Sequence, residues 1–430
     1  MKSYTQHIKK NRSKKNMMLF SSGLFVSLLG TQMFNFAVGL YVLTLTGSGL
    51  SFATTLVIGS LPRFIAAPFL GVVVDRFDRK RLIYMSDFIC GILVLSMLLM
   101  SRNGEFKLAI IYFITFCLGI VNTLFDIAAS ASKPNLVEDK ELLQINALSQ
   151  GITSTAMIMG PLLGGLVYAT LDFKFFVLIN GCSFIISGVS ECFLEFDTHL
   201  KTKTKEESKY LKDIQEGLQY LINHKGLSRI LGISVAINFF IHFAVIIPLP
   251  YVLNIVYKVS AKQYGFVNST FSIGMILMTM ILFKMKNQSK IIKTIPYAVL
   301  TYGVFILMMA LPVWNSTLLW EPTLTVVFYS FLMFVFGITI AILDIPFMAY
   351  AQRSVEENMR GRVFSTFLSI SKIASPIALL LSGYLIEFVS IKTLCTSSGI
   401  LLMVLLLKLG VMNLGSVMQE SEEQVSEAIL

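Results

Sequence analysis

Residues 71–81 of the chain read Gly71-Val-Val-Val-Asp75-Arg76-Phe77-Asp78-Arg79-Lys80-Arg81, a dense group of charges with a long apolar run on each side. Residues 50–74 carry one charge, Arg63, and residues 82–101 carry only Asp87 before the closing serine. Two such runs joined by so short a link predict a helical hairpin across a bilayer. The tip holds four cations against two anions, so the positive-inside rule places it in the cytoplasm.

The composition places the whole chain in the membrane class. Its 430 residues are 55% hydrophobic and only 14% charged, and the mean hydropathy is +0.73, whereas a soluble protein of this length would expose more charge. The net charge is +10, but the cations gather at the ends of apolar runs, so we expect a lipid bilayer and no nucleic acid as partner. Five cysteines lie inside apolar runs without metal-ligand spacing, and we expect packing residues, with no metal and no cofactor. They are Cys90, Cys117, Cys182, Cys192 and Cys395.

Apolar runs long enough to cross a hydrocarbon core of about 30 Å occur twelve times. They span residues 17–45, 50–74, 82–101, 107–131, 145–170, 173–194, 229–257, 264–283, 291–312, 322–350, 364–388 and 391–413. The prediction is therefore an all-α integral membrane protein with twelve transmembrane helices in two pseudo-symmetric six-helix halves.

The distribution of Lys and Arg predicts the orientation. Of the 35 Lys and Arg residues, 27 fall in segments on the side of the N-terminus and six on the other, which places both termini in the cytoplasm. The expected parts are a basic tail (1–16), the N-terminal half (17–194), an amphipathic linker on the inner membrane face (195–228), the C-terminal half (229–413) and an acidic tail (414–430). The first apolar run is too long for a signal peptide, so we expect an uncleaved first span.

An internal repeat supports the two halves. Residues 119–127 and 337–345 align at an offset of 218 and share Gly-Ile at the start and Asp-Ile at the end. The shared acids are Asp126 and Asp344, which lie in spans four and ten. These two spans are equivalent if six spans were duplicated.

The charged loop at 71–81 resembles the loop between spans two and three of the major facilitator superfamily. A glycine pattern in span five resembles a motif of its drug:proton antiporter branch, which includes macrolide-efflux proteins and the enterobactin exporter. The matching residues are Gly151, Gly160, Pro161, Gly164 and Gly165, with Ala156 in place of an intermediate glycine. Arg360-Gly361-Arg362 after span ten also fits, and the resemblance covers residues 17–413.

The resemblance implies a transporter in the bacterial plasma membrane that works as a monomer by alternating access, with a small molecule and protons as partners. One departure concerns span four, where many relatives carry an arginine and this chain has Gly119. Asp126 is then the nearer candidate for a proton carrier.

Asp75 suggests a gate within the charged loop, because an anion at the end of span two adds nothing to topology. Gly71 would let another helix approach one turn earlier. The positive N-terminal end of span eleven, at Arg360-Gly361-Arg362, would attract Asp75. The resemblance implies that this latch, which includes the loop cations, holds the inner gate shut. The simpler interpretation is a topology signal alone.

Ionisable residues inside spans are rare and usually functional. The coupling candidates are Asp126, Asp344, Arg63, His242 and Lys372. Asp126 and Asp344 could carry protons, or each could be permanently paired with Arg63 or Lys372, and an exposed cationic pair could instead meet an anionic substrate. His242 could relay protons or make a helix contact. Glu191 lies near the inner end of its span, where we expect its side chain to reach the interface.

Polar residues of spans one, seven and ten could line a cavity rather than pack in the core. The candidates are Gln32, Asn35, Asn238 and Tyr329. With 34 Phe and 21 Met, such a cavity would accept varied apolar ligands.

The sequence thus favours a proton-coupled efflux transporter of small amphipathic, drug-like or macrolide-like compounds that contributes to multidrug resistance. The alternatives are a siderophore, metallophore or lysolipid exporter of the same fold, and a non-transporting membrane sensor or scaffold. No cluster of His, Cys, Ser and Asp has catalytic spacing, so an enzyme is not expected.

Overall fold

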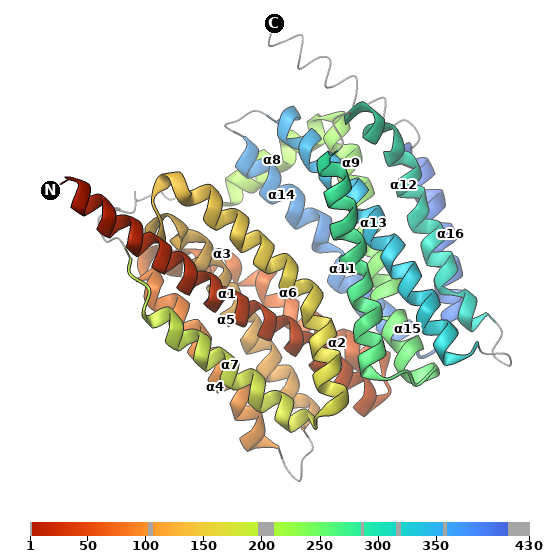
Figure 1. Ribbon diagram of the computed structural model, residues 1–430. Coiled ribbons are helices and arrows are strands. Elements are labelled where there is room, and N and C mark those ends of the chain that lie inside the picture. The colour runs from red at the N-terminus through yellow and green to blue at the C-terminus, as the bar shows by residue number, and fades with distance from the viewer. Residues whose placement is uncertain are drawn as a thin grey trace, which may run out of the picture. The chain divides into compact units, whose positions relative to one another are not determined.

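The computed structural model describes residues 2–101, 106–196, 210–284, 288–314, 320–355 and 359–411. These residues form helices joined by short turns, and none of them lies in a strand (Figure 1). The long helices are α1 (Lys2–Thr46), α2 (Gly49–Ile65), α3 (Ala67–Arg76), α4 (Arg79–Met100), α5 (Leu108–Leu136), α6 (Leu142–Thr170), α7 (Phe173–Cys192), α8 (Tyr210–Asn223), α9 (Lys225–Ile241), α11 (Ala261–Lys284), α12 (Gln288–Met309), α13 (Pro322–Ser354), α14 (Arg360–Ile373), α15 (Ser375–Leu385) and α16 (Ile391–Lys408). The predicted acidic tail 414–430 and residues 197–209 of the predicted linker lie outside the described part.

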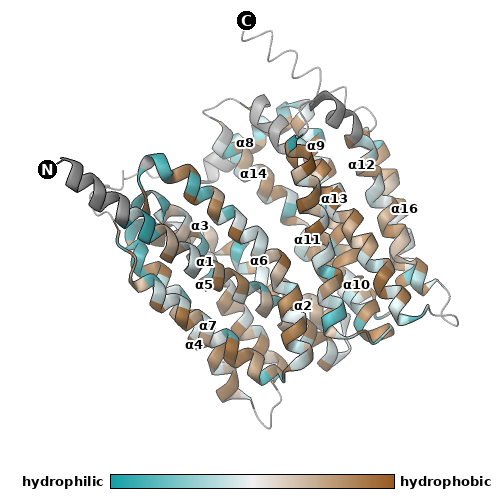
Figure 2. Cartoon of the chain, in the orientation of Figure 1, coloured by the Kyte–Doolittle hydropathy of each residue, from teal (hydrophilic) through white to brown (hydrophobic). Residues whose placement is uncertain are grey.

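The helices confirm the predicted number of membrane crossings. In the described ranges, eleven helical segments are long and apolar enough to cross a membrane, and the number is twelve when the bent pair formed by α2 and α3 is counted as one broken span. This pair bends by 58°, and Pro68 in the first turn of α3 explains the break, since proline has no N–H to continue the helical bonding. Figure 2 shows α4 and α13 coloured mainly hydrophobic.

The predicted span at 229–257 is the least regular. α9 is followed by π-helical turns at His242–Ile246 and Tyr251–Val256, on either side of the short α10 (Pro248–Pro250). Two prolines so close together remove two N–H donors, and the neighbouring turns widen to keep their carbonyls bonded. His242 therefore lies at the first residue of a distorted segment.

The chain forms two compact units. Unit 1 contains residues 1–46, 55–204 and 260–266, and unit 2 contains residues 47–54, 205–259 and 267–430. The first turns of α11 thus belong to unit 1, and the rest of α11 belongs to unit 2. The first turns of α2 belong to unit 2, and the rest of α2 belongs to unit 1. The core of unit 1 includes Phe34, Phe176 and Phe184 between α1 and α7, and a second cluster around Phe20 and Phe125.

The repeat appears in the packing of both units. A Cβ at Gly119 of α5 would lie 2.7 Å from the carbonyl oxygen of Gly59 in α2. At the equivalent Gly337 of α13, a Cβ would collide with the carbonyl oxygen of Phe271 in α11. Both glycines therefore allow two backbones to approach closely. They explain why the aligned segments keep Gly at the start.

The linker contains the expected amphipathic helix, and in unit 2 this helix packs on α14. A Cβ at Gly217 of α8 would lie 2.7 Å from the carbonyl oxygen of Arg362 in α14. Leu221, one turn later, is fully buried, whereas Ile222 beside it is exposed. One face of α8 thus covers protein, and the predicted contact of this helix with the membrane surface stays a prediction.

Candidate functional site

The charged loop is fixed to unit 1 by its own residues. Asp78 caps α4, its carboxylate accepting a hydrogen bond from the backbone N–H of Arg81 at 3.2 Å. The Arg79 guanidinium donates to the carbonyl oxygen of Ala131 at 2.9 Å and to the side chain of Asn135 at 3.3 Å, both on α5. The turn between α3 and α4 is therefore held in a defined place against α5.

Asp75, the proposed latch residue, is 74% exposed and lies 3.8 Å from the Arg79 guanidinium. This is a long ion pair on a solvated surface and contributes little to stability. Within unit 1, no described atom lies within 4 Å of a Cβ placed at Gly71. Arg76 and Arg81 are exposed as well, and Lys80 is half-buried. Most charges of this loop thus stay accessible.

The corresponding cations of unit 2 meet the linker helix. Arg362 donates to the Glu216 carboxylate of α8 at 2.7 Å. A Cβ at Gly361 would meet no described atom within 4 Å, and the side chain of Arg360 lies outside the described part. The N-terminal turn of α14 is therefore occupied by an ion pair that the sequence did not reveal.

Asp126 and Arg63 form an ion pair inside the apolar spans of unit 1. The Arg63 guanidinium of α2 donates to the Asp126 carboxylate of α5 at 2.8 Å. The exposed fractions of the two side chains are 66% and 41%. Of the open alternatives for Asp126, pairing with Arg63 is the one found. The pair is not sealed in the core.

Three of the other coupling candidates gather in unit 2. Lys372 of α14 acts electrostatically on both Asp344 of α13 and His242, and Asp344 and Lys372 are exposed. The Nδ1 atom of His242 lies 2.7 Å from the carbonyl oxygen of Asn238, one turn earlier. His242 thus has a local backbone partner, as the simpler interpretation predicts. No group of three or more His, Cys, Asp and Glu side chains in the described ranges could hold a metal.

Two buried carboxyl groups lie outside the predicted site. Asp87 of α4 is 1% exposed and Glu191 of α7 is 0% exposed. The prediction that Glu191 reaches the interface is wrong, because its carboxyl group packs against Gly23 of α1. Asp87 was not predicted, although it is the single acid of the apolar run 82–101.

The glycines of α6 act as contact points for other helices. A Cβ at Gly160 would collide with Gln32 of α1, and one at Gly164 would lie 3.3 Å from the backbone of α1. A Cβ at Gly165 would lie 3.1 Å from Gly265, in the turn of α11 that belongs to unit 1. Only Gly151 of this set has open space around it. Close packing therefore accounts for three of the four glycines.

The cavity candidates differ in exposure. Asn35 is exposed and Gln32 is half-buried against α6. Asn238 is half-buried and donates to the carbonyl oxygen of Ser234 at 2.9 Å. Tyr329 is fully buried, and its hydroxyl donates to the carbonyl oxygen of Met309 at 2.8 Å. Tyr329 is thus a core residue in unit 2 rather than part of an exposed wall.

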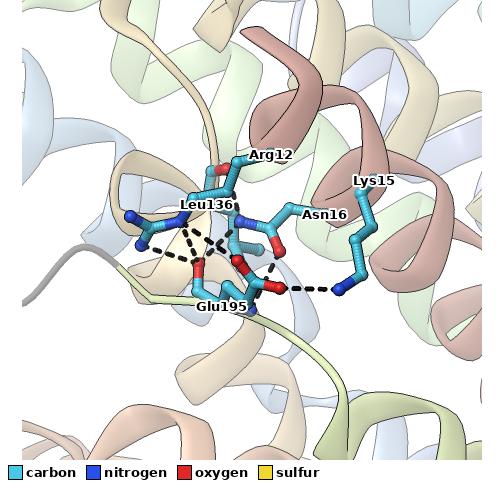
Figure 3. Close-up of polar contacts among 5 residues, drawn as sticks. All are labelled: Arg12, Lys15, Asn16, Leu136 and Glu195. Carbon is cyan, nitrogen blue, oxygen red and sulfur yellow. Dashed lines mark hydrogen bonds and ion pairs between the residues drawn. The ribbon is translucent and has the colours of Figure 1, made fainter. Parts of the chain in front are cut away.

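The first helix is fixed to the end of α7 by a polar cluster that was not predicted (Figure 3). The buried Asn16 side chain donates to the carbonyl oxygens of Leu136 and Glu195 and accepts from the Glu195 N–H. Arg12 donates to the Glu195 carbonyl, and Lys15 lies 2.6 Å from its carboxylate. The Lys15 ammonium holds the pKa of Glu195 below its ordinary value.

The comparison with known families decides the identity of the fold. The family model of the Major Facilitator Superfamily matches residues 20–379. The chain belongs to this superfamily.

Curated relatives of this superfamily member are transporters. It is 24% identical over 399 residues to macrolide efflux protein A of Streptococcus pyogenes, covering 92% of this chain and 95% of the relative. It is 27% identical over 146 residues to the enterobactin exporter EntS of Shigella boydii, covering 34% of this chain and 35% of the relative. The family match and these relatives identify a transporter and not an enzyme.

Solved structures show the same fold. A mutant of the nucleoside transporter NupG matches with a TM-score of 0.68 at 12% identity, over 94% of this chain and 99% of that one. A bacterial homologue of the iron transporter ferroportin matches with a TM-score of 0.64 at 15% identity, over 92% and 98%.

The missing span-four arginine has a packing explanation in this superfamily member. Gly119 occupies its place, and a Cβ there would lie 2.9 Å from the Pro62 ring of α2. A long side chain would push α2 away from α5. The cation of this region is instead Arg63, next to Pro62 on α2, and it reaches Asp126 on α5.

Proposed function

We propose that this transporter couples the export of small amphipathic, drug-like or macrolide-like compounds to protons by alternating access. The observation that carries the proposal is the Arg63–Asp126 pair, a part-exposed ion pair inside apolar spans. Charges in spans are costly, and they are usually kept where an ion or a substrate must pass. The similarity to macrolide efflux protein A over 92% of the chain supports the cargo class.

A proton on Asp126 is expected to release Arg63. The neutral carboxylic acid loses the Coulomb attraction of the 2.8 Å pair, so Arg63 is left as an unpaired cation. Asp344 near Lys372 offers a second place for the same exchange. A membrane potential supplies about 2.3 kcal/mol per charge per 100 mV, which suffices for modest accumulation of cargo outside.

Replacing the two acids tests the coupling. Asp126→Asn and Asp344→Asn are to be made in cells that express the transporter, with efflux of a macrolide measured as a function of external pH. We expect each variant to lose most of the pH dependence, because an amide cannot take up the proton. Asp172→Asn, an exposed acid at the start of α7, is the matched control. Full pH-dependent efflux in both intramembrane variants would refute the assignment.

Anionic cargo is the second candidate. Arg63 and Lys372 are exposed cations within spans, and a siderophore, metallophore or lysolipid could compete with Asp126 for Arg63. The partial similarity to the enterobactin exporter fits this idea. Accumulation assays with a catecholate siderophore beside a macrolide would separate the two. If neither compound stimulates proton flux in proteoliposomes, a sensor or scaffold becomes the better explanation.

A further inference from the structure

Asp87 and Glu191 lie against the same stretch of α1 in unit 1. The Ser27 hydroxyl of α1 donates to the Asp87 carboxyl at 2.7 Å. One turn earlier on α1, a Cβ at Gly23 would lie 2.9 Å from Oε1 of Glu191. Ser187, one turn before Glu191 on α7, donates to the Gly23 carbonyl oxygen at 3.0 Å. The two acids therefore face successive turns of one helix, between α4 and α7.

The oxygens of this pair are largely without partners. Oδ2 of Asp87 and both carboxyl oxygens of Glu191 are buried and accept no hydrogen bond from any described residue. No Lys or Arg of the described ranges forms an ion pair with either acid. The absence of a side chain at Gly23 leaves the space that the Glu191 carboxyl fills.

Asp87 and Glu191 cannot both stay ionised where their carboxyl groups are buried and unpaired. An unpaired buried charge costs several kcal/mol, and a like charge beside it adds to that cost. At least one of the two carboxyl groups therefore keeps its proton. The Ser27 hydroxyl donates to Asp87 and stabilises its ionised form. Glu191 accepts no hydrogen bond that would stabilise its ionised form, so it is the acid expected to keep the proton.

We propose that Asp87 and Glu191 form a buried proton-binding site of unit 1, in which at least one of the two carboxyl groups, held by α4 and α7 against α1, keeps its proton. The titratable group next to Asp87 is the Cys90 thiol, one turn later on α4. The neighbouring helices α5 and α1 also carry Asp126 and Lys15, and these residues are paired with Arg63 and Glu195.

The position of this site connects it to α1. Loss of the proton would place a negative charge next to the Gly23 and Ser27 turns of α1. Gly23 has no side chain that could donate a hydrogen bond to this charge. The charge would favour separation of α1 from α7 and entry of water. Use of this step in transport rests on the proposed function, whereas the binding of the proton does not.

Infrared difference spectroscopy on purified full-length protein without substrate tests the proposal. Buffers from about pH 5 to about pH 9 are compared, and the deuterium-sensitive carbonyl stretch of protonated carboxyl groups is followed. We expect Glu191→Gln to lose a component of this band that persists at neutral pH in the wild type. Asp172→Asn on the same helix should leave the band unchanged.

A milder variant guards against misfolding. Ser27→Ala keeps both acids but removes the donor to Asp87, and it should shift the same band. A band that changes in neither Glu191→Gln nor Ser27→Ala would overturn the proposal. So would a thermal stability that rises with Na⁺ at constant pH in the wild type and not in Glu191→Gln, because the site would then bind a metal ion. Transport assays play no part in these readouts.

Discussion

Asn16 is the residue on which the N-terminal polar cluster depends. It is 1% exposed and uses its amide to satisfy backbone groups of Leu136 and Glu195. Replacement by alanine leaves buried donors and acceptors without partners, which costs about 1–3 kcal/mol. We expect Asn16→Ala to lower the thermal unfolding temperature in detergent, whereas Lys15→Met, which removes only an exposed ion pair, should change it little. Equal effects of both variants would contradict this role of Asn16.

The Lys15–Glu195 pair predicts a pH dependence in the acid range. The hydrogen bond and charge of Lys15 lower the pKa of Glu195 from its ordinary value of 4.5. A group with a lowered folded pKa contributes stability above its unfolded value and loses it as the pH falls through the folded one. The contribution should therefore be constant at neutral pH and fade in acid. Glu195→Gln should flatten this dependence of the free energy of unfolding on pH in the acid range. If the dependence is the same in the variant and the wild type, the Lys15–Glu195 pair does not cause it.

Single residues could be assigned a type of chemistry from the sequence, but not a partner. Asp126 was equally compatible with a free proton carrier and an ion pair, and the spatial neighbour Arg63 resolves the pairing. Glu191 lies near a helix end, which suggested exposure, yet Gly23 on another helix covers it. Burial of a side chain depends on residues far away in the chain, and an apolar run gives no register between helices.

At the scale of helices, α6 offers a matched test of close packing. Gly165 faces the Gly265 turn of α11, and a Cβ there would lie 2.5 Å from the Ala261 carbonyl oxygen. We expect Gly165→Ala to destabilise the protein by about 1–3 kcal/mol through overpacking. Gly151→Ala in the same helix has free space and should be neutral or stabilising by about 0.5–1 kcal/mol. Thermal unfolding of both variants checks this, and the reverse order would contradict it.

The elements themselves followed closely from the apolar runs. Predicted spans such as 173–194 and 391–413 differ by a few residues from α7 and α16, because length and hydropathy alone decide whether a segment can cross a bilayer. The breaks were less visible. The bend between α2 and α3 and the π-helical turns next to Pro248 depend on how neighbouring helices pack.

At the scale of the whole molecule, the latch at Asp75 is a prediction about the balance between conformations. Asp75→Asn removes an exposed charge that would be attracted to the positive N-terminal end of α14. We expect the variant to raise the labelling rate of a cysteine placed at the predicted inner end of α6 and to lower it at the outer end. Asp172→Asn is the control. Unchanged labelling at both ends would count against the latch.

The membrane class, the twelve crossings and the superfamily are predictable from the amino-acid order alone, because each depends on local composition or on contiguous motifs. The predicted cytoplasmic location of the termini depends likewise on the counted cations. Which charges meet is known only from the folded arrangement of the helices. Arg63 pairs with Asp126 and Arg362 pairs with Glu216, while Asp87 and Glu191 both lie against α1. Such pairs bring together residues on different helices, and their positions follow from how glycine-rich faces pack rather than from any spacing along the chain.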